Sequence, residues 1–173
     1  MLPSSMQCAP RMTPSFSQLL QVLSRHQVEY IVVGGVAAVI HGAPMTTFDL
    51  DALVRVSQAN ATRLLSALTE LDARFREHRQ RIVPSREDIL AGGHLLLMTQ
   101  AGPLDVLGFI GDRQQYDDLI DQTSEVRIGE WTLRVLDLEE LIRQKQKMGR
   151  PKDVAAAELL EEVLRMRSGP DEQ

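Results

Sequence analysis

Two aspartates, Asp49 and Asp51, are the residues whose type and spacing most clearly suggest chemistry in this sequence. They lie in residues 48–54, where the alternation of polar and apolar side chains predicts a strand with one face in water. Side chains two residues apart on a strand leave the same face, with Cα atoms about 6.5 to 7 Å apart. Positions 46 to 53 contain no basic residue, so nothing nearby in the sequence offsets the repulsion between the two carboxylates.

A divalent cation would remove that repulsion. Carboxylate oxygens are preferred ligands of Mg²⁺ and Mn²⁺, and two such ions about 3.5 to 4 Å apart stabilise the attacking and leaving oxygens in phosphoryl or nucleotidyl transfer. We therefore expect Asp49 and Asp51 to bind Mg²⁺ or Mn²⁺. The alternative is that both carboxylates are merely exposed on an edge strand.

A glycine pair, Gly34-Gly35, follows a β-branched run at residues 28–33 and precedes a short helix expected at residues 36–41. Glycine lets the backbone come close to a ligand, and the N–H groups at a helix N-terminus favour an anion. A nucleoside triphosphate is such an anion. A tight strand-to-helix turn without a ligand is the alternative.

Together, residues 31–42 and 46–51 resemble the nucleotidyltransferase superfamily, which includes DNA polymerase beta and the bacterial minimal nucleotidyltransferases. In that family a glycine turn is followed by an Asp-x-Asp or Asp-x-Glu strand, and a third carboxylate comes from a later strand. Asp105 stands at the place of this third carboxylate. The resemblance implies a Mg²⁺- or Mn²⁺-dependent enzyme in which Asp49, Asp51 and Asp105 are both metal ligands and catalytic residues.

The C-terminal part, with residues 141–145 and 149–153, resembles the tail of AbiEii-type bacterial nucleotidyltransferases. This resemblance implies that Lys145 contacts the triphosphate of an NTP substrate, and that Asp153 orients the lysine or a substrate group. Gly34 and Gly35 would complete the nucleotide-binding set. The acceptor hydroxyl would belong to tRNA, to a protein or to a small molecule, and a toxin–antitoxin role in a bacterial cytoplasm would be in keeping with the family.

Two departures from the family pattern support a second hypothesis. Val36 stands where a serine or threonine often helps to hold phosphate, and Met45 stands where an arginine or lysine is common. Both changes weaken the expected contact with nucleotide. The alternative function is a weakly active or inactive nucleotidyltransferase-fold module that binds and regulates another protein.

The pattern of elements predicts an α/β or α+β fold, a mixed sheet flanked by helices with further helices at the C-terminus. The expected helices cover 15–26, 36–41, 57–71, 137–148 and 151–166, and the expected strands cover 28–33, 48–54, 94–99, 103–110, 126–128 and 131–135. Asp137 and Glu140 form a capping-box pattern at the fourth helix. We expect a disordered leader (1–13), a nucleotidyltransferase core (14–136) and a helical hairpin (137–167) packed on the core.

Composition excludes several classes of protein. The 173 residues are 43% hydrophobic and 25% charged, which is typical of a globular domain. No apolar run is long enough to span a membrane, and the N-terminus does not resemble a signal peptide, so we expect a cytoplasmic protein. A net charge of −5 and an aromatic content of 4% disfavour a plain nucleic-acid binder. The arginines between Arg74 and Arg86 are interpreted as a solvated face, with a local basic patch as the alternative.

Overall fold

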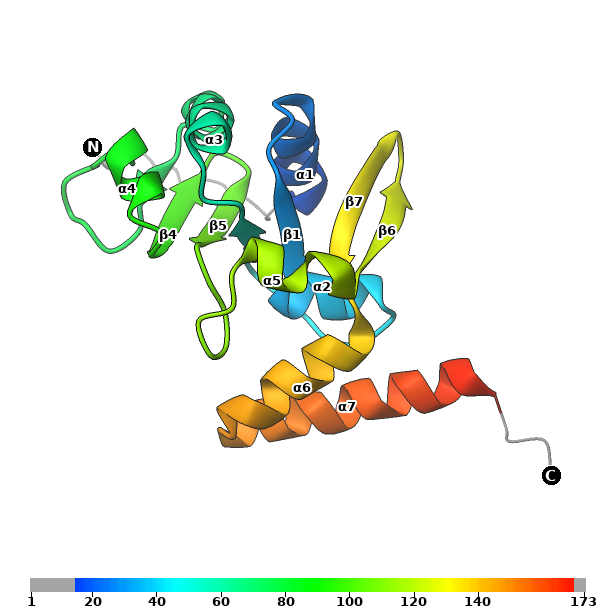
Figure 1. The fold of residues 1–173 in the computed structure, drawn as a ribbon. Coiled ribbons are helices and arrows are strands. Elements are labelled where there is room, and N and C mark those ends of the chain that lie inside the picture. Colours follow the sequence, from blue (N-terminus) through cyan, green and yellow to red (C-terminus); the bar gives the residue numbers. More distant parts are fainter. Residues whose placement is uncertain (1–14, 170–173) are drawn as a thin grey trace, which may run out of the picture.

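The computed structural model describes residues 15–169, which include the expected core from residue 15 onward and the whole expected helical hairpin; the expected leader, residues 1–13, lies outside them. Figure 1 shows a twisted sheet with helices packed around it and a pair of long helices below. In chain order the elements are α1 (Phe16–Arg25), β1 (Tyr30–Val33), α2 (Gly34–Ile40), β2 (Leu50–Val54), α3 (Gln58–Glu70), β3 (Arg74–Phe75), α4 (Arg86–Leu90), β4 (His94–Thr99), β5 (Gly102–Leu107), α5 (Tyr116–Leu119), the 3₁₀ turn η1 (Ile120–Gln122), β6 (Thr123–Ile128), β7 (Trp131–Leu136), α6 (Leu138–Met148) and α7 (Pro151–Ser168).

The sheet is mixed, as the sequence predicts. Within residues 15–169 its seven strands lie in the order β3-β4-β5-β2-β1-β7-β6. β2 runs antiparallel to β1 and parallel to β5, while β1 runs parallel to β7. All four residues of β1 are buried, whereas along β4 and β5 every second side chain is buried. The centre of the sheet is therefore covered on both faces, and the β4–β5 side keeps one face open to water.

The helix α1 shows how local sequence fixes an element. The hydroxyl of Ser15 accepts a hydrogen bond from the N–H of Gln18, which caps the first turn and typically contributes about 1 kcal/mol. Leu19, Leu20 and Leu23 lie on one side of the helix and are buried in the core. This helix contacts β5, β7 and α3, so it covers one face of the sheet (Figure 1).

The last two helices form an antiparallel pair (Figure 1). Gly149 ends α6 with a left-handed φ of +65°, and Pro151 opens α7, as the sequence predicts. Leu138, Leu141 and Ile142 of α6 join the hydrophobic core of the sheet. The division of the chain at residue 136 stays a prediction.

Some sequence predictions are wrong in detail. Asp137 precedes α6, but its side chain makes no capping bond because it accepts a hydrogen bond from the hydroxyl of Ser124 instead. The carboxylate of Glu140 is likewise engaged elsewhere, by Gln144 at 2.7 Å and by Arg143. α2 begins at Gly34 rather than at Val36. The short elements β3, α4, α5 and η1 were not predicted, since each has five residues or fewer and lacks a period that can be read.

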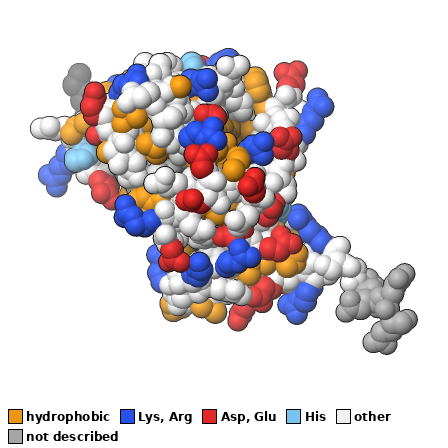
Figure 2. All heavy atoms as spheres, viewed as in Figure 1, with side chains coloured by type: hydrophobic (Ala, Val, Ile, Leu, Met, Phe, Trp, Pro, Cys, Tyr) orange, Lys and Arg blue, Asp and Glu red, His pale blue; other side chains and the backbone are white. Residues whose placement is uncertain are grey.

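The charged residues of the sequence are distributed over the surface, as expected of a globular domain. Figure 2 shows acidic and basic side chains mixed over the face in view. Among the described helices, none combines the length and the apolar character that crossing a membrane requires.

Candidate functional site

The three predicted carboxylates meet at one place. Asp51 of β2 lies directly opposite Asp105 of the parallel strand β5, and residues paired in this way point to the same face of a sheet. Asp49 lies one residue before β2, in a bend rather than in the predicted strand. Each of the three residues offers one carboxylate oxygen, and these oxygens lie within 4.8 Å of one another.

Position 34 favours glycine for two reasons: its backbone is left-handed, and the carboxylate of Asp51 lies close to it. Its φ is +63°, and a Cβ at this position would lie 2.2 Å from Oδ2 of Asp51. A Cβ on Gly35 would lie 2.6 Å from Oγ1 of Thr47, which donates a hydrogen bond to the carbonyl of Asp49 at 3.2 Å. The two glycines therefore let the segment that carries the aspartates pack directly against the first turn of α2.

A pocket of about 520 Å³ opens over these groups. It lies at the end of β1 and is walled by α2, β5 and α6. Its polar and charged lining consists of Thr47, Asp49, Asp51, His94, Asp105, Gln144, Lys145, Arg150 and Lys152, with the backbone of Gly34 and Gly35. The pocket therefore contains six of the seven predicted site residues.

The negative charges of the carboxylates in this pocket are only partly compensated by nearby cations. Burial raises the pKa of Asp51 to about 7, and the negative charges of Asp49 and Asp105 add to that effect, while Lys145 and Arg76 oppose it. Burial also raises the pKa of Asp105, although Arg76 lowers it. The cations of the protein thus leave part of the negative charge uncompensated. A cluster of hard oxygen donors with this imbalance fits a divalent cation.

The seventh predicted residue, Asp153, lies behind the pocket rather than in its wall. It is 1% exposed, and its Oδ1 is 3.2 Å from Nζ of Lys145 while its Oδ2 accepts from Nε of Arg150 at 2.5 Å. Burial alone would raise its pKa, but the hydrogen bonds from Arg150 and Lys145 lower it. Asp153 therefore stays ionised and contacts Lys145, while its expected roles in orienting the lysine and in nucleotide binding stay predictions.

Arg76 is a site residue that sequence reasoning missed. It donates a hydrogen bond to Oδ1 of Asp105, so this residue, although exposed as a solvated face requires, is also paired with a carboxylate of the site. Positions 46 to 53 contain no cation, and the arginine that contacts Asp105 comes from a position 29 residues before it. The sequence contains no local signal for that contact, because it depends on the pairing of β3, β4 and β5.

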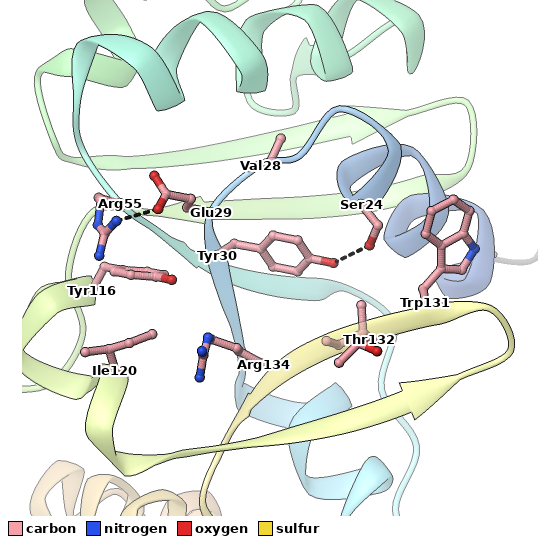
Figure 3. A pocket seen from close by; sticks show the side chains of 11 residues that line it. Ser24, Val28, Glu29, Tyr30, Arg55, Tyr116, Ile120, Trp131, Thr132 and Arg134 are labelled. Carbon is pink, nitrogen blue, oxygen red and sulfur yellow. Dashed lines mark hydrogen bonds and ion pairs between the residues drawn. The ribbon is translucent and has the colours of Figure 1, made fainter.

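A second pocket, of about 540 Å³, lies at the opposite end of β1 (Figure 3). Arg55 donates to Glu29 and Asp117 there, and its guanidinium lies 4.5 Å from the centre of the Tyr116 ring. Arg134, which also lines this pocket, is 3.4 Å from Glu125. In this pocket the charged groups of Arg55, Glu29 and Arg134 already have partners.

Comparisons with known proteins bear on the fold. Neither a scan against protein-family models nor a search of curated proteins gave a match. Solved structures do match. A nucleotidyltransferase candidate from Thermotoga maritima has a TM-score of 0.53 at 19% identity, over 86% of this chain and 89% of its own.

Two antibiotic-resistance proteins are also similar in structure. The antibiotic-resistance factor ANT(2'')-Ia has a TM-score of 0.56 at 14% identity, over 87% of this chain and 83% of its own. The lincosamide antibiotic adenylyltransferase LnuA, solved with lincomycin bound, has a TM-score of 0.59 at 12% identity, over 87% of this chain and 99% of its own. These similarities confirm the predicted nucleotidyltransferase fold, and at such identities they are informative about the fold alone.

Proposed function

We propose that this nucleotidyltransferase-fold chain is a Mg²⁺- or Mn²⁺-dependent nucleotidyltransferase, which transfers a nucleoside monophosphate from an NTP to an acceptor hydroxyl. The observation that carries the proposal is the meeting of Asp49, Asp51 and Asp105, whose carboxylate oxygens lie within 4.8 Å of one another at a pocket large enough for a nucleotide. The fold supports it. The raised pKa of Asp51 is the further sign expected of a functional carboxylate.

Asp49, Asp51 and Asp105 would hold the metal. When bound, a divalent cation would offset the charge of these carboxylates and stabilise negative charge on the transferring phosphoryl group. The close approach of Asp51 to Gly34 fixes one carboxylate in place before any ligand arrives. Such pre-positioning reduces the reorganisation that the reaction requires.

The other residues of the pocket would bind the substrate. Lys145 would contact the triphosphate as a point charge, held in position by the buried carboxylate of Asp153, and the backbone of Gly34 and Gly35 would approach the phosphates. In the transfer, a bond forms between the acceptor oxygen and the α-phosphorus, and the bond from that phosphorus to the bridging oxygen breaks. Pyrophosphate leaves, and Asp105 takes the proton of the acceptor hydroxyl.

The acceptor and the cellular role are further parts of the proposal. tRNA, a protein and a small molecule are the candidate acceptors, and among the structural neighbours LnuA is a lincosamide adenylyltransferase solved with lincomycin. We further propose a bacterial, cytoplasmic protein that acts in a toxin–antitoxin pair.

A second candidate function is a weakly active or inactive module that binds another protein. Val36 is 5% exposed in the core, and Met45 packs against the core. Neither residue lines the pocket around the carboxylates. The two positions where the family often carries a phosphate-binding side chain thus contribute none here, which favours a weaker hold on nucleotide.

Labelled substrate separates the two functions. The protein is incubated with each of the four α-labelled NTPs, Mg²⁺, and cellular RNA, protein or metabolite extract. Transfer of label that Asp49→Ala abolishes is the result expected of the enzyme. Absence of transfer to every extract, together with tight binding of one partner protein that survives Asp49→Ala, would reject the enzyme and favour the binding module.

Lys145→Ala tests the triphosphate contact. As a contact made equally in the ground and transition states, it should raise KM for the NTP with a smaller fall in kcat. Lys147→Ala is the matched control, since Lys147 lies on the same helix, is paired with Asp112 and does not line the pocket. Equal effects of the two substitutions would contradict the assigned role of Lys145.

A further inference from the structure

Arg76, which directly follows β3, lies in one row with residues of β4, β5 and β2. Its N–H donates to the carbonyl of Leu96 on β4 at 2.9 Å, Leu96 lies opposite Asp105 on β5, and Asp105 lies opposite Asp51 on β2. Residues in such a row point to the same face of a sheet. The contact of Arg76 with Asp105 therefore follows from the register of the sheet.

The guanidinium of Arg76 is only partly used within the protein. Its Nη2 donates to Asp105 and, at 3.3 Å, to the carbonyl of Leu97. Over residues 15–169, its Nε and Nη1 make no hydrogen bond, and its side chain is 32% exposed. An arginine has five N–H donors in a planar fork, so this side chain keeps donors for a ligand while it holds Asp105.

The position of Arg76 separates it from the proposed triphosphate site. Across the sheet, Asp105 lies between Asp51 and the β4–β3 side, whereas Gly34 follows β1 on the other side of Asp51. Asp105 is the carboxylate proposed to take the proton of the acceptor. The molecule that carries the acceptor hydroxyl must then lie beside Arg76.

The other arginines near Arg76 in the sequence lie elsewhere. Residues 74–86 contain five arginines and one glutamate, in a chain of net charge −5. Arg74 is paired with Asp72 and lines a separate pocket together with Arg81, while Arg86 bonds to Gln58 and Thr62 of α3. Arg76 is therefore the arginine of this segment that contacts the carboxylate cluster, and its charge would attract a phosphate and repel a cationic acceptor.

We propose that Arg76 is a specificity-determining residue on the acceptor side, and that the acceptor carries a phosphate near its reacting hydroxyl. The inference rests on the proposed function and adds the chemical class of the acceptor. Two sources share this chemistry: the 3′ end of a nucleic-acid strand and a small sugar phosphate. Arg76 would bind the phosphate through its remaining donors and keep Asp105 beside the hydroxyl.

Binding without turnover tests the proposal. A fluorescently labelled single-stranded oligoribonucleotide with a free 3′ hydroxyl is titrated with the protein, in the presence of Mn²⁺ and a non-hydrolysable ATP analogue. Arg76→Ala should weaken binding about tenfold, as expected for loss of a charge-assisted contact, and Arg76→Lys should weaken it less. Arg127→Ala should leave binding unchanged, because Arg127 is an exposed arginine on β6 at the opposite edge of the sheet.

A second measurement on the wild-type protein keeps the test independent of folding defects in the variants. Replacing the last phosphodiesters of the oligonucleotide by uncharged methylphosphonates should weaken binding to a similar extent. Competition by ribose 5-phosphate identifies the source, since displacement at low concentration indicates a small sugar phosphate and failure to displace indicates a strand. Equal binding by Arg76→Ala and Arg127→Ala, or equal binding of charged and uncharged oligonucleotides, would overturn the proposal.

Failure of this inference can be told apart from failure of the proposed function. The ATP analogue with Mn²⁺ should bind to the wild type and not to Asp51→Asn. If it does so while no phosphate-bearing acceptor binds, the acceptor class is wrong and the nucleotidyltransferase proposal stands. If the analogue does not bind at all, the proposed function itself is contradicted.

Discussion

The two pockets at the ends of β1 have similar volumes, about 520 Å³ around the carboxylates and about 540 Å³ around Arg55, and both are lined with charged side chains. They differ in how those charges are compensated. Arg55 is held by Glu29 and Asp117 and lies over an aromatic ring. The carboxylate of Asp51 is half-buried next to two others, and partial burial together with their negative charges raises its pKa to about 7.

This difference indicates what each pocket contributes. Paired charges with a stacked ring stabilise the fold where they are, and they need no ligand. A buried cluster of like charges lowers stability until something of opposite charge binds. The imbalance of charge, rather than the volume, therefore distinguishes the pocket that we propose to act on a substrate.

The largest effect is expected from Gly34→Ala. The new Cβ would meet Oδ2 of Asp51 at 2.2 Å, and the φ of +63° is strained for alanine, so we expect a loss of roughly 3 kcal/mol or more in the free energy of unfolding. Gly129→Ala is the control, since Gly129 has φ of +61° but nothing within 4 Å of its Cβ position. Urea denaturation of both variants measures the difference. Equal losses would show that Asp51 does not pack against Gly34.

The second largest effect is expected in the stability that the protein gains when a metal binds. A ligand at 100 times its dissociation constant stabilises the folded state by about 2.7 kcal/mol, so Mn²⁺ should raise the melting temperature of the wild type. Asp49→Asn and Asp51→Asn should remove the shift, because each loses a carboxylate of the cluster. Glu29→Gln, which removes a carboxylate from the other pocket, should keep it. A shift that is the same in all four proteins would place the metal elsewhere.

Arg55→Met is expected to lower the free energy of unfolding by about 1 to 2 kcal/mol. It removes two partly exposed ion pairs, each worth up to about 1 kcal/mol, and the stacking on Tyr116. The Mn²⁺-induced shift should be unchanged in this variant. If Arg55→Met lost the metal response while remaining folded, the two pockets would be coupled and their separation by charge would be mistaken.

The smallest effect concerns Asp51 in the metal-free protein. Its pKa is raised in the fold, so between about pH 4 and pH 7 the native chain binds a proton that the unfolded chain has released, and stability falls as the pH rises through this range. Asp51→Asn removes that dependence. We expect it to stabilise the metal-free protein by up to about 1 kcal/mol at pH 8, with the gain vanishing near pH 4. A destabilised Asn variant at pH 8 would indicate a structural hydrogen bond to the carboxylate.

The sequence predicted the glycines and the carboxylates because each carries a local signal. Gly34 and Gly35 interrupt a β-branched run, and the spacing of Asp49 and Asp51 puts both side chains on one face. Asp105 came from the resemblance, and the structure places it opposite Asp51. The three residues are therefore predictable without the register of the sheet, although the register is what brings Asp105 to the other two.

Arg76 could not be predicted in the same way. The two-residue strand β3 that precedes it is too short to show alternation, and the arginines around it are typical of an exposed segment. Its partner is set by two strand pairings, β3 with β4 and β4 with β5. The capping box at Asp137 failed for a related reason, since Ser124 and Arg143, rather than backbone groups, take the two carboxylates.

The pairing of β1 with β7 has a consequence for synthesis of the chain. β1 is complete at Val33, yet its parallel neighbour is β7, with Val32 opposite Val135. A nascent chain must extend about a hundred residues further before this contact can form, and closing so long a loop is slow. Asp105 and Lys145 are also synthesised well after Asp49 and Asp51. The pocket around the carboxylates therefore forms only after Lys145 has been synthesised, so a ribosome-bound fragment that already carries Asp49 and Asp51 but ends before Asp105 would still lack the complete candidate site.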